Sequence, residues 1–461
     1  MSHLITDWHP EDPQFWRTQG RRVARRNLWI SIPALFLAFA IWQVWSVTVI
    51  NLPNIGFDFS ANQLFWLAAV PALSGATCRG FYAFMVPIFG GRKWTTLSTA
   101  SLLLPALGLG FAVQDPNTSY ATLLLLALLC GFGGGNFSSS MANISFFYPK
   151  AEKGTALGLN AGLGNLGISA AQFLIPLVIT GAVLGWPAGA PQIWHDANGS
   201  KEIWLQNAGF MWVPLILLSA GAAWFGMNDL ACAKASFRDQ AVIFKRKHNW
   251  IMCVLYLGTF GSFLGFSAGF PLLIKTQFPH IDPVQYAYLG PLIGAFARPT
   301  GGWLADKIKS GALITQIVFL GTVLGVVGVL LCLPDDSGQG GHFWGFFASF
   351  MLLFAMTGLG NGSTFRQIPV IFLDIHQQRV SRGEVDAEQA IRDANKESAA
   401  VVGFTGAFAA FGGFFIPKSY GTSIDLTGHV TAALYFFIVF YAMCCVINWW
   451  YYLRKNAEAK C

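Results

Sequence analysis

The stretch FWLAAVPALSGATCRGFYAFMVPIF, residues 65–89, carries a single charged residue, Arg79, in an otherwise apolar or small-residue run. A helix needs about 20 predominantly apolar residues to cross a bilayer, and this stretch is longer than that. A cation near the middle of a membrane span costs roughly 2.5–3.5 kcal/mol on insertion scales, so such residues generally face a partner inside the protein. The stretch therefore predicts a membrane helix with Arg79 as a candidate binding residue.

The whole chain has the composition of a polytopic membrane protein. Of its 461 residues, 54% are hydrophobic and only 11% are charged, and the mean hydropathy is +0.50. These values lie outside the range of soluble globular domains. We therefore predict an all-α polytopic membrane protein. The twelve expected transmembrane helices are 28–50, 62–90, 96–114, 120–147, 155–185, 207–227, 250–274, 286–305, 312–333, 343–373, 396–417 and 430–453.

Lys and Arg are distributed unevenly between the two sets of loops. Nearly all of them fall on the side of the N-terminal segment 1–27, whereas the opposite side has only Lys201, Lys275 and Lys418. Because cytoplasmic loops carry the excess of basic residues, both termini are expected in the cytoplasm, including the tail 454–461. The net charge of +7 is then a signal of topology, and nucleic-acid binding is not expected. The first apolar run is too long for a cleaved signal peptide and should stay as the first span.

Cysteine and histidine patterns give no support to an enzyme or a metalloprotein. The eight cysteines lack metal-binding spacing and are expected to be free thiols. All eight histidines are predicted to lie in loops or near helix ends, which argues against a haem or metal site inside the helix bundle. We therefore expect no cofactor, no metal and no catalytic constellation.

The chain contains traces of an internal repeat. The longest basic connection, 228–249, separates a first six-helix bundle, 28–227, from a second, 250–453. Parallel repeats of this kind are typical of transporters whose two halves are related by an axis along the membrane normal. Such symmetry would place Arg79 and Arg298 on opposite walls of a central cavity. The features that recur in the same order are Arg79 and Arg298, GGGN ending at Asn136 and GLGN ending at Asn361, and FLIP (173–176) and FFIP (414–417).

The two intramembrane arginines indicate an anionic ligand. All 22 Asp and Glu residues are predicted to lie in loops, at segment ends or in terminal segments, so no protein carboxylate is expected beside Arg79 or Arg298. A guanidinium offers a planar fork of donors that suits a small planar oxyanion such as nitrate or nitrite. The alternative is that each arginine bonds helix carbonyls or snorkels. Arg366, near a cytoplasmic helix end and Asp374, is expected to snorkel or to form an interfacial ion pair.

Glycines recur along two of the predicted helices, with four-residue spacing in the segment 154–167. A bare backbone stripe of this kind permits close helix packing, and it would also let helices slide and close around a small anion. Asn165 lies on the first stripe and could either donate to an anion or link two helices. The predicted gating or packing glycines are Gly158, Gly162, Gly164, Gly167, Gly403 and Gly406.

Several of these segments resemble the NarK-type nitrate/nitrite transporters of the major facilitator superfamily, the nitrate/nitrite porter family. The similar segments are GFGGGNFSSSMANISFFYPKAEKGTALGLNAGLGNLG (131–167), YLGTFGSFLGFSAGFP (256–271), GPLIGAFARPTGGWLAD (290–306) and GFTGAFAAFGGFFIPK (403–418). The resemblance covers nearly the whole chain, and it implies a bacterial inner-membrane carrier with the fold of that superfamily, whose two pseudo-symmetric six-helix bundles rock to alternate access.

The resemblance also implies roles for individual residues. Arg79 and Arg298 match the paired arginines that bind the anion in this family. Asn165 matches an amide position and Tyr256 a tyrosine position of the family's site. Phe137 and Phe260 match the phenylalanines that sandwich the planar anion. Ala161, where relatives often have glycine, and Arg366, where a neutral residue is expected, depart from the family pattern.

The expected mechanism is an exchange of nitrate inward for nitrite outward. An empty site with two buried cations is costly to seal from water, so only the loaded carrier should occlude readily. Proton-coupled nitrate symport is the main alternative, but it usually needs a titratable group at membrane depth, and none is predicted. A transport-inactive nitrate sensor is a further alternative, which the short loops do not favour. The expected partners are nitrate, nitrite and membrane lipid, with no obligate protein partner.

Overall fold

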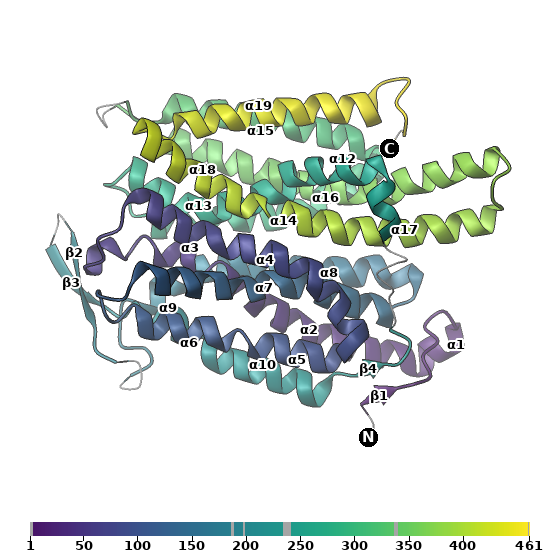
Figure 1. The fold of residues 1–461 in the computed structure, drawn as a ribbon, viewed down its shortest axis with the longest axis horizontal. Coiled ribbons are helices and arrows are strands. Elements are labelled where there is room, and N and C mark those ends of the chain that lie inside the picture. Colours follow the sequence, from purple (N-terminus) through teal and green to yellow (C-terminus); the bar gives the residue numbers. More distant parts are fainter. Residues whose placement is uncertain (1–2, 186–188, 197–198, 234–240, 336–339, 460) are drawn as a thin grey trace. The chain divides into compact units, whose positions relative to one another are not determined.

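The computed structural model describes the chain except for residues 1–2, 186–188, 197–198, 234–240, 336–339 and 460, so part of the predicted linker 228–249 lies outside the described residues. Helices dominate the structure (Figure 1). Up to Gly226 they are α1 Pro13–Phe15, η1 Trp16–Gly20, α2 Arg21–Trp42, α3 Trp45–Thr48, η2 Pro53–Ile55, α4 Ala61–Phe89, α5 Gly91–Ala100, α6 Leu103–Ala112, α7 Tyr120–Phe147, α8 Lys150–Val178, α9 Asn207–Phe210 and α10 Trp212–Gly226.

The remaining helices follow the connection between the halves. They are η4 Ala241–Lys245, α12 Lys247–Tyr256, η5 Leu257–Gly261, α13 Ser262–Gln277, η6 Pro283–Gln285, α14 Leu289–Ile308, α15 Gly311–Cys332, α16 Phe343–Ser381, α17 Ala387–Ala409, α18 Gly412–Thr427, α19 Thr431–Asn448 and η7 Trp449–Leu453.

Strands are short and lie outside the membrane helices. The strand β1 (Leu4–Ile5) pairs in parallel with β4 (Asp229–Leu230), which attaches the N-terminal segment to the residues that follow α10. The strands β2 (Gln192–Asp196) and β3 (Gly199–Ile203) form an antiparallel hairpin, with Gln192 opposite Ile203. The second pair lies in the connection between α8 and α9.

The described chain divides into two compact units, which we describe separately. Unit 1 comprises residues 1–235, 267–276 and 281–288, and unit 2 comprises residues 236–266, 277–280 and 289–461. The later part of α13 therefore belongs to unit 1, although α13 begins in unit 2.

In each unit, glycines bring the helix that carries the intramembrane arginine close to a neighbouring helix. In unit 1, a Cβ at Gly131 of α7 would lie 2.6 Å from the backbone nitrogen of Gly75 on α4. In unit 2, a Cβ at Gly362 of α16 would lie 2.1 Å from the carbonyl oxygen of Arg298 on α14. Contacts this short exclude any side chain, so the backbones approach as they do in small-residue membrane interfaces. The same packing thus recurs beside the arginine of each half.

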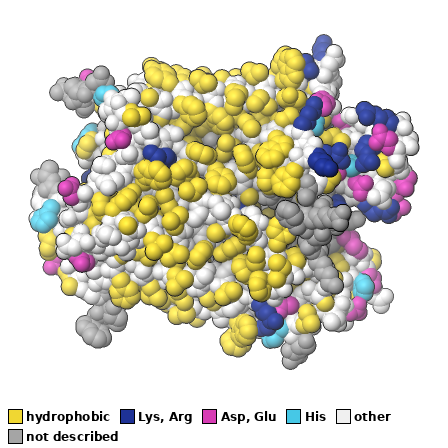
Figure 2. Space-filling model, viewed as in Figure 1, with side chains coloured by type: hydrophobic (Ala, Val, Ile, Leu, Met, Phe, Trp, Pro, Cys, Tyr) yellow, Lys and Arg dark blue, Asp and Glu magenta, His cyan; other side chains and the backbone are white. Residues whose placement is uncertain are grey.

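Each of the twelve predicted spans corresponds to helix in the structure, and the all-helical architecture is confirmed. In the described part of the chain, eleven helical segments are long and apolar enough to cross a membrane. The exception among the expected spans is α14, whose hydropathy is lowered by Arg298, Asp306 and Lys307. Figure 2 shows mostly hydrophobic side chains along the helix flanks on the face drawn, with charged side chains gathered at helix ends.

Several helices extend further than the hydropathy of the sequence predicted. Helix α2 begins at Arg21 instead of 28, α16 continues to Ser381 instead of 373, and α17 begins at Ala387 instead of 396. Hydropathy reports only the apolar part of a helix, whereas the hydrogen-bonded backbone continues through the polar ends. At α17 the Asp386 side chain caps the helix by accepting from the backbone N–H of Gln389.

Replacing Gly301 by alanine tests the glycine-mediated packing of α14 on α16. A Cβ at Gly301 would lie 2.0 Å from the carbonyl oxygen of Leu359, and backbone atoms cannot move aside cheaply. We expect Gly301→Ala to lower the thermal unfolding temperature of the detergent-solubilised protein, although alanine normally favours a helix by about 1 kcal/mol over glycine. Gly403→Ala is the matched control, because its Cβ would meet no atom within 4 Å. Equal unfolding temperatures for the two variants would contradict this packing.

Candidate functional site

Arg79 lies on α4 in the interior of unit 1. Its exposed fraction is 1%, and its Nε donates a hydrogen bond of 3.0 Å to the carbonyl oxygen of Gly134 on α7. Its Cζ lies 5.1 Å from the centre of the Trp42 ring and 4.7 Å from that of Phe137. Stacking against aromatic faces stabilises a desolvated cation by up to about 2 kcal/mol. We call Arg79, Trp42 and Phe137 the N-terminal half-site.

Trp42 is held rigidly beside Arg79. Its Nε1 donates a hydrogen bond of 2.7 Å to the carbonyl oxygen of Pro71 on α4. The ring occupies space left by two glycines, because a Cβ at Gly75 or at Gly134 would each lie 2.6 Å from a Trp42 ring atom. The glycine-rich part of α7 therefore shapes this half-site by admitting a large ring.

Asn165 on α8 is buried, with an exposed fraction of 1%. Its Oδ1 has no hydrogen-bond partner among the residues that the structure describes. Asn160, on the same helix, donates from Nδ2 to the Ser140 hydroxyl on α7 at 2.8 Å. Asn160 thus forms an interhelical link of the kind that the sequence allowed for Asn165.

Arg298 lies on α14 in unit 2 and is partly buried. Its Cζ lies 6.0 Å from the centre of the Phe260 ring and 5.7 Å from that of Phe365 on α16. Its Nη1 is buried and has no hydrogen-bond partner in the described part of the chain. A buried donor of a charged group without a partner costs more than about 1–3 kcal/mol. Unit 2 thus holds a cation with one buried donor, Nη1, that no described residue accepts.

Tyr256 and Phe260 lie next to each other beside that cation. Their rings stack with centroids 5.3 Å apart and an interplanar angle of 19°. The Tyr256 hydroxyl donates a hydrogen bond of 2.7 Å to Oδ1 of Asn361 on α16. Phe260 lies in η5, a π-helical turn, and such turns are frequent at functional sites because they re-aim side chains. We call Arg298, Phe260, Phe365 and Tyr256 the C-terminal half-site.

The predicted glycines fall into two groups. On α8, a Cβ at Gly164 would lie 2.7 Å from the Leu35 side chain, and one at Gly167 would lie 2.1 Å from the carbonyl oxygen of Phe36, so both pack closely on α2. A Cβ at the other four would meet no atom within 4 Å. These four are Gly158, Gly162, Gly403 and Gly406.

Glu397, which the sequence placed at the start of the span 396–417, lies inside a helix because α17 begins earlier, at Ala387. Glu397 lies in α17 within a candidate span, is only 7% exposed, and bonds Arg246 through both carboxylate oxygens at 2.7 and 2.9 Å. This hydrogen bond raises the pKa of Arg246. His376, near the end of α16 at Ser381, is fully buried, and its Nε2 lies 3.4 Å from Glu397. Both were missed because the helices extend beyond their apolar parts.

For Arg366 the sequence predicted either snorkelling or an ion pair. It forms an ion pair, but with Asp306 on α14 instead of Asp374. Its Nε lies 2.8 Å from the Asp306 carboxylate. None of the ion pairs found among the described residues includes Arg298, whose neighbours in the C-terminal half-site are aromatic.

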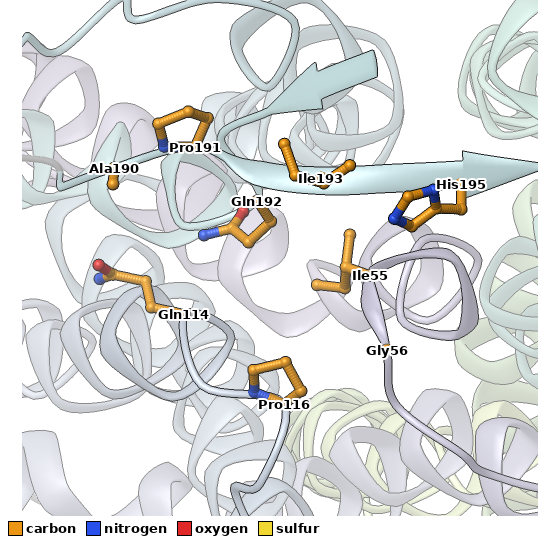
Figure 3. Close-up of a pocket in the computed structure, with 9 residues that line it drawn as sticks. All are labelled: Ile55, Gly56, Gln114, Pro116, Ala190, Pro191, Gln192, Ile193 and His195. Atoms are coloured by element: carbon orange, nitrogen blue, oxygen red, sulfur yellow. The ribbon is translucent and has the colours of Figure 1, made fainter. Parts of the chain in front are cut away.

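A surface pocket of about 430 Å³ in unit 1 is separate from both half-sites (Figure 3). Its polar lining residues are Gln114, Gln192 and His195. Gln114 donates to the carbonyl oxygen of Gly110, Gln192 bonds Gln206, and His195 bonds the hydroxyl of Ser200. These side chains are engaged within the protein, and none of them is a lysine or an arginine. The pocket therefore lacks the charge that an anion site requires.

Sequence reasoning missed two members of the half-sites, Trp42 and Phe365, and the neighbouring Asn361. Trp42, Phe365 and Asn361 contact Arg79, Arg298 and Tyr256 respectively. Asn361 ends the repeated GLGN motif, so the repeat contained a usable signal for it. The two aromatic residues had none, because the chain contains 41 Phe and 17 Trp residues.

Comparison with known proteins identifies the family. Residues 34–383 match the sequence pattern of the family described as the Major Facilitator Superfamily. The nitrate/nitrite transporter NarU of Salmonella typhimurium is 51% identical over 94% of this chain and 92% of its own length, and NarU of Escherichia coli is 49% identical over the same shares. The probable nitrate/nitrite antiporter NarK2 of Thermus thermophilus is 44% identical over 99% of this chain and 98% of its own length.

Solved structures show the same fold. A bacterial homologue of the human lysosomal transporter Spinster has a TM-score of 0.64, with 13% identity over 92% of this chain and 95% of that chain. The D-xylose-proton symporter also has a TM-score of 0.64, with 14% identity over 95% and 98%. The prediction of a multi-pass transport protein rather than an enzyme is confirmed. This chain belongs to the major facilitator superfamily, in the family of nitrate/nitrite transporters that contains NarU and NarK2.

Proposed function

We propose that this chain exchanges nitrate for nitrite across a bacterial inner membrane, with both of its termini in the cytoplasm. The observation that carries the proposal is the Arg298 guanidinium, which has a buried donor without a partner in the described chain and two phenyl rings beside it. A planar anion can accept that donor edge-on while its faces meet aromatic rings. The relatives NarU and NarK2, which are 44–51% identical to this chain, are named as nitrate/nitrite transporters or antiporters, and this supports nitrate and nitrite as the cargo.

In this proposal Arg79 and Arg298 bind one anion as the two halves close. Phe137 and Phe260 cover the faces of the anion, because each already lies beside one of the two guanidinium groups. Tyr256 is held by Asn361 and fixes the orientation of the Phe260 ring. Asn165 supplies a further amide, whose N–H group can be turned toward the anion by rotation about the side chain.

The exchange mechanism follows from the charge of the empty site. Two permanently cationic side chains removed from water without a counter-ion cost several kcal/mol, and a bound anion offsets part of this cost. The loaded carrier would therefore close readily, whereas the empty carrier would not. The open space beside Gly158, Gly162, Gly403 and Gly406 supports movement of α8 and α17 during closure.

Arg79→Lys and Arg298→Lys test the binding mode at constant charge. Lysine keeps the positive charge but loses the planar donor fork, so we expect nitrate transport to fall roughly 100-fold in each variant. The measurement is nitrate counterflow into proteoliposomes that contain equal amounts of folded protein. Arg366→Lys is the matched control, because an ion pair with Asp306 tolerates lysine. Wild-type rates in Arg79→Lys or Arg298→Lys would exclude fork-type binding.

The coupling is tested by uptake into two kinds of vesicle. Proteoliposomes preloaded with nitrite should take up external nitrate rapidly, whereas empty proteoliposomes should not, with or without an inward proton gradient. Uptake into empty vesicles that follows the proton gradient would overturn exchange and support proton-coupled nitrate symport.

Proton-coupled symport is the second candidate because of the buried Glu397 and His376. On the exchange hypothesis this pair is structural, since Glu397 holds Arg246 at the start of α12 against α17. Glu397→Gln should then lower the unfolding temperature without changing the pH dependence of exchange. Glu388→Gln, which disrupts the exposed ion pair with Arg392, should change neither the unfolding temperature nor the pH dependence of exchange. A pH dependence that disappears only in Glu397→Gln would favour the proton-coupled candidate.

A further inference from the structure

The first membrane helix begins with a row of arginines, three of which form no ion pair with any residue that the structure describes. Arg17 on η1 and Arg22 and Arg25 on α2 are exposed, and none of the three forms an ion pair or a side-chain hydrogen bond in the described chain. The two arginines next to them in the sequence do have partners. Arg21 lies 3.9 Å from Glu152, and Arg26 donates a hydrogen bond of 2.6 Å to the Asn228 side chain. We call Arg17, Arg22 and Arg25 the arginine face.

The arginine face continues into an exposed tryptophan on the same side of the helix. Arg22, Arg25 and Trp29 are spaced by three and then four residues, which places them along one face of α2. The Trp29 side chain is 56% exposed. Tryptophan is enriched where a membrane helix crosses the lipid headgroup region. Trp29 therefore marks the level of the headgroups, and the arginines lie one to three turns farther from the hydrocarbon.

The opposite face of this segment is fixed to unit 1. Ala24 and Leu28 of α2 are buried in a hydrophobic cluster that also contains Trp8 and Trp16. The Nε1 of Trp8 donates to the carbonyl oxygen of Phe146, and the Nε1 of Trp16 donates to Glu152 at 2.9 Å. With the β1–β4 pairing, these contacts hold the arginines on a rigid support instead of a free tail. Less side-chain and backbone entropy is lost when a rigid surface binds a ligand.

We propose that the arginine face binds the phosphate groups of anionic phospholipids, of which phosphatidylglycerol is the representative. Arginine binds phosphate with two parallel charge-assisted hydrogen bonds, and basic clusters next to a membrane helix attract anionic lipid. A topology signal alone requires only that basic residues lie on one side, and scattered residues such as Lys93 and Lys245 would satisfy it. The alignment of the unneutralised arginines with an interfacial tryptophan goes beyond that requirement.

The test compares lipid binding to the purified full-length chain in an uncharged detergent. The protein is titrated with phosphatidylglycerol or phosphatidylcholine, and bound lipid is measured by native mass spectrometry. The wild type should prefer phosphatidylglycerol. The triple variant Arg17→Gln, Arg22→Gln, Arg25→Gln should lose about tenfold or more of that preference, since each basic residue at an anionic surface contributes roughly fivefold in affinity. Added salt should reduce the wild-type preference.

Two further variants separate charge from structure. A triple variant Lys93→Gln, Lys245→Gln, Lys455→Gln removes the same charge from exposed positions elsewhere and should keep the lipid preference. The variant Arg17→Lys, Arg22→Lys, Arg25→Lys should recover most of it. An equal loss in the lysine control, an unchanged preference in the arginine-to-glutamine variant, or full competition by soluble glycerol phosphate would each overturn the proposal.

Discussion

A guanidinium group held inside a membrane helix is the constraint on which the rest of this structure depends. It cannot lose its proton, so the protein must compensate the charge by contacts rather than by titration. Arg79 is compensated by two aromatic faces and one helix carbonyl. Arg298 has two aromatic faces at greater distances and a donor that no described residue accepts. The two halves therefore share a chemical plan, in which a guanidinium group lies against aromatic rings.

The glycines explain how such large groups fit between closely packed helices. In unit 1 the missing side chains of Gly75 and Gly134 admit the Trp42 ring that covers Arg79. In unit 2 the backbone of α14 at Arg298 lies against Gly362 of α16. Aliphatic side chains at these positions would separate the helices and move the arginines away from their aromatic neighbours. The packing of the helix pair and the position of the cation are therefore one structural problem, solved in a similar way in each half.

The sequence predicted the features that follow from hydropathy and from rare residues. Arg79 and Arg298 were conspicuous because charges are rare in apolar runs, and the helices around them were found because their apolar runs are long. Trp42 and Phe365 could not be distinguished from many other aromatic residues, since only three-dimensional proximity to an arginine separates them. Glu397 and His376 were missed for a different reason. They lie where a helix has become polar but is still buried by its neighbours, and hydropathy does not record burial of that kind.

The buried Glu397 changes the argument for exchange without removing it. Its carboxylate is buried inside α17, so a titratable group is present within the helices of unit 2. Glu397 nevertheless accepts hydrogen bonds from two nitrogens of the Arg246 fork, so both of its carboxylate oxygens are engaged within the protein. Taking up a proton there would leave Arg246 without its counter-ion, at a cost that transport would have to supply in each cycle. The proposed exchange needs no such step, because the charge of the arginines is balanced by the anion that is carried.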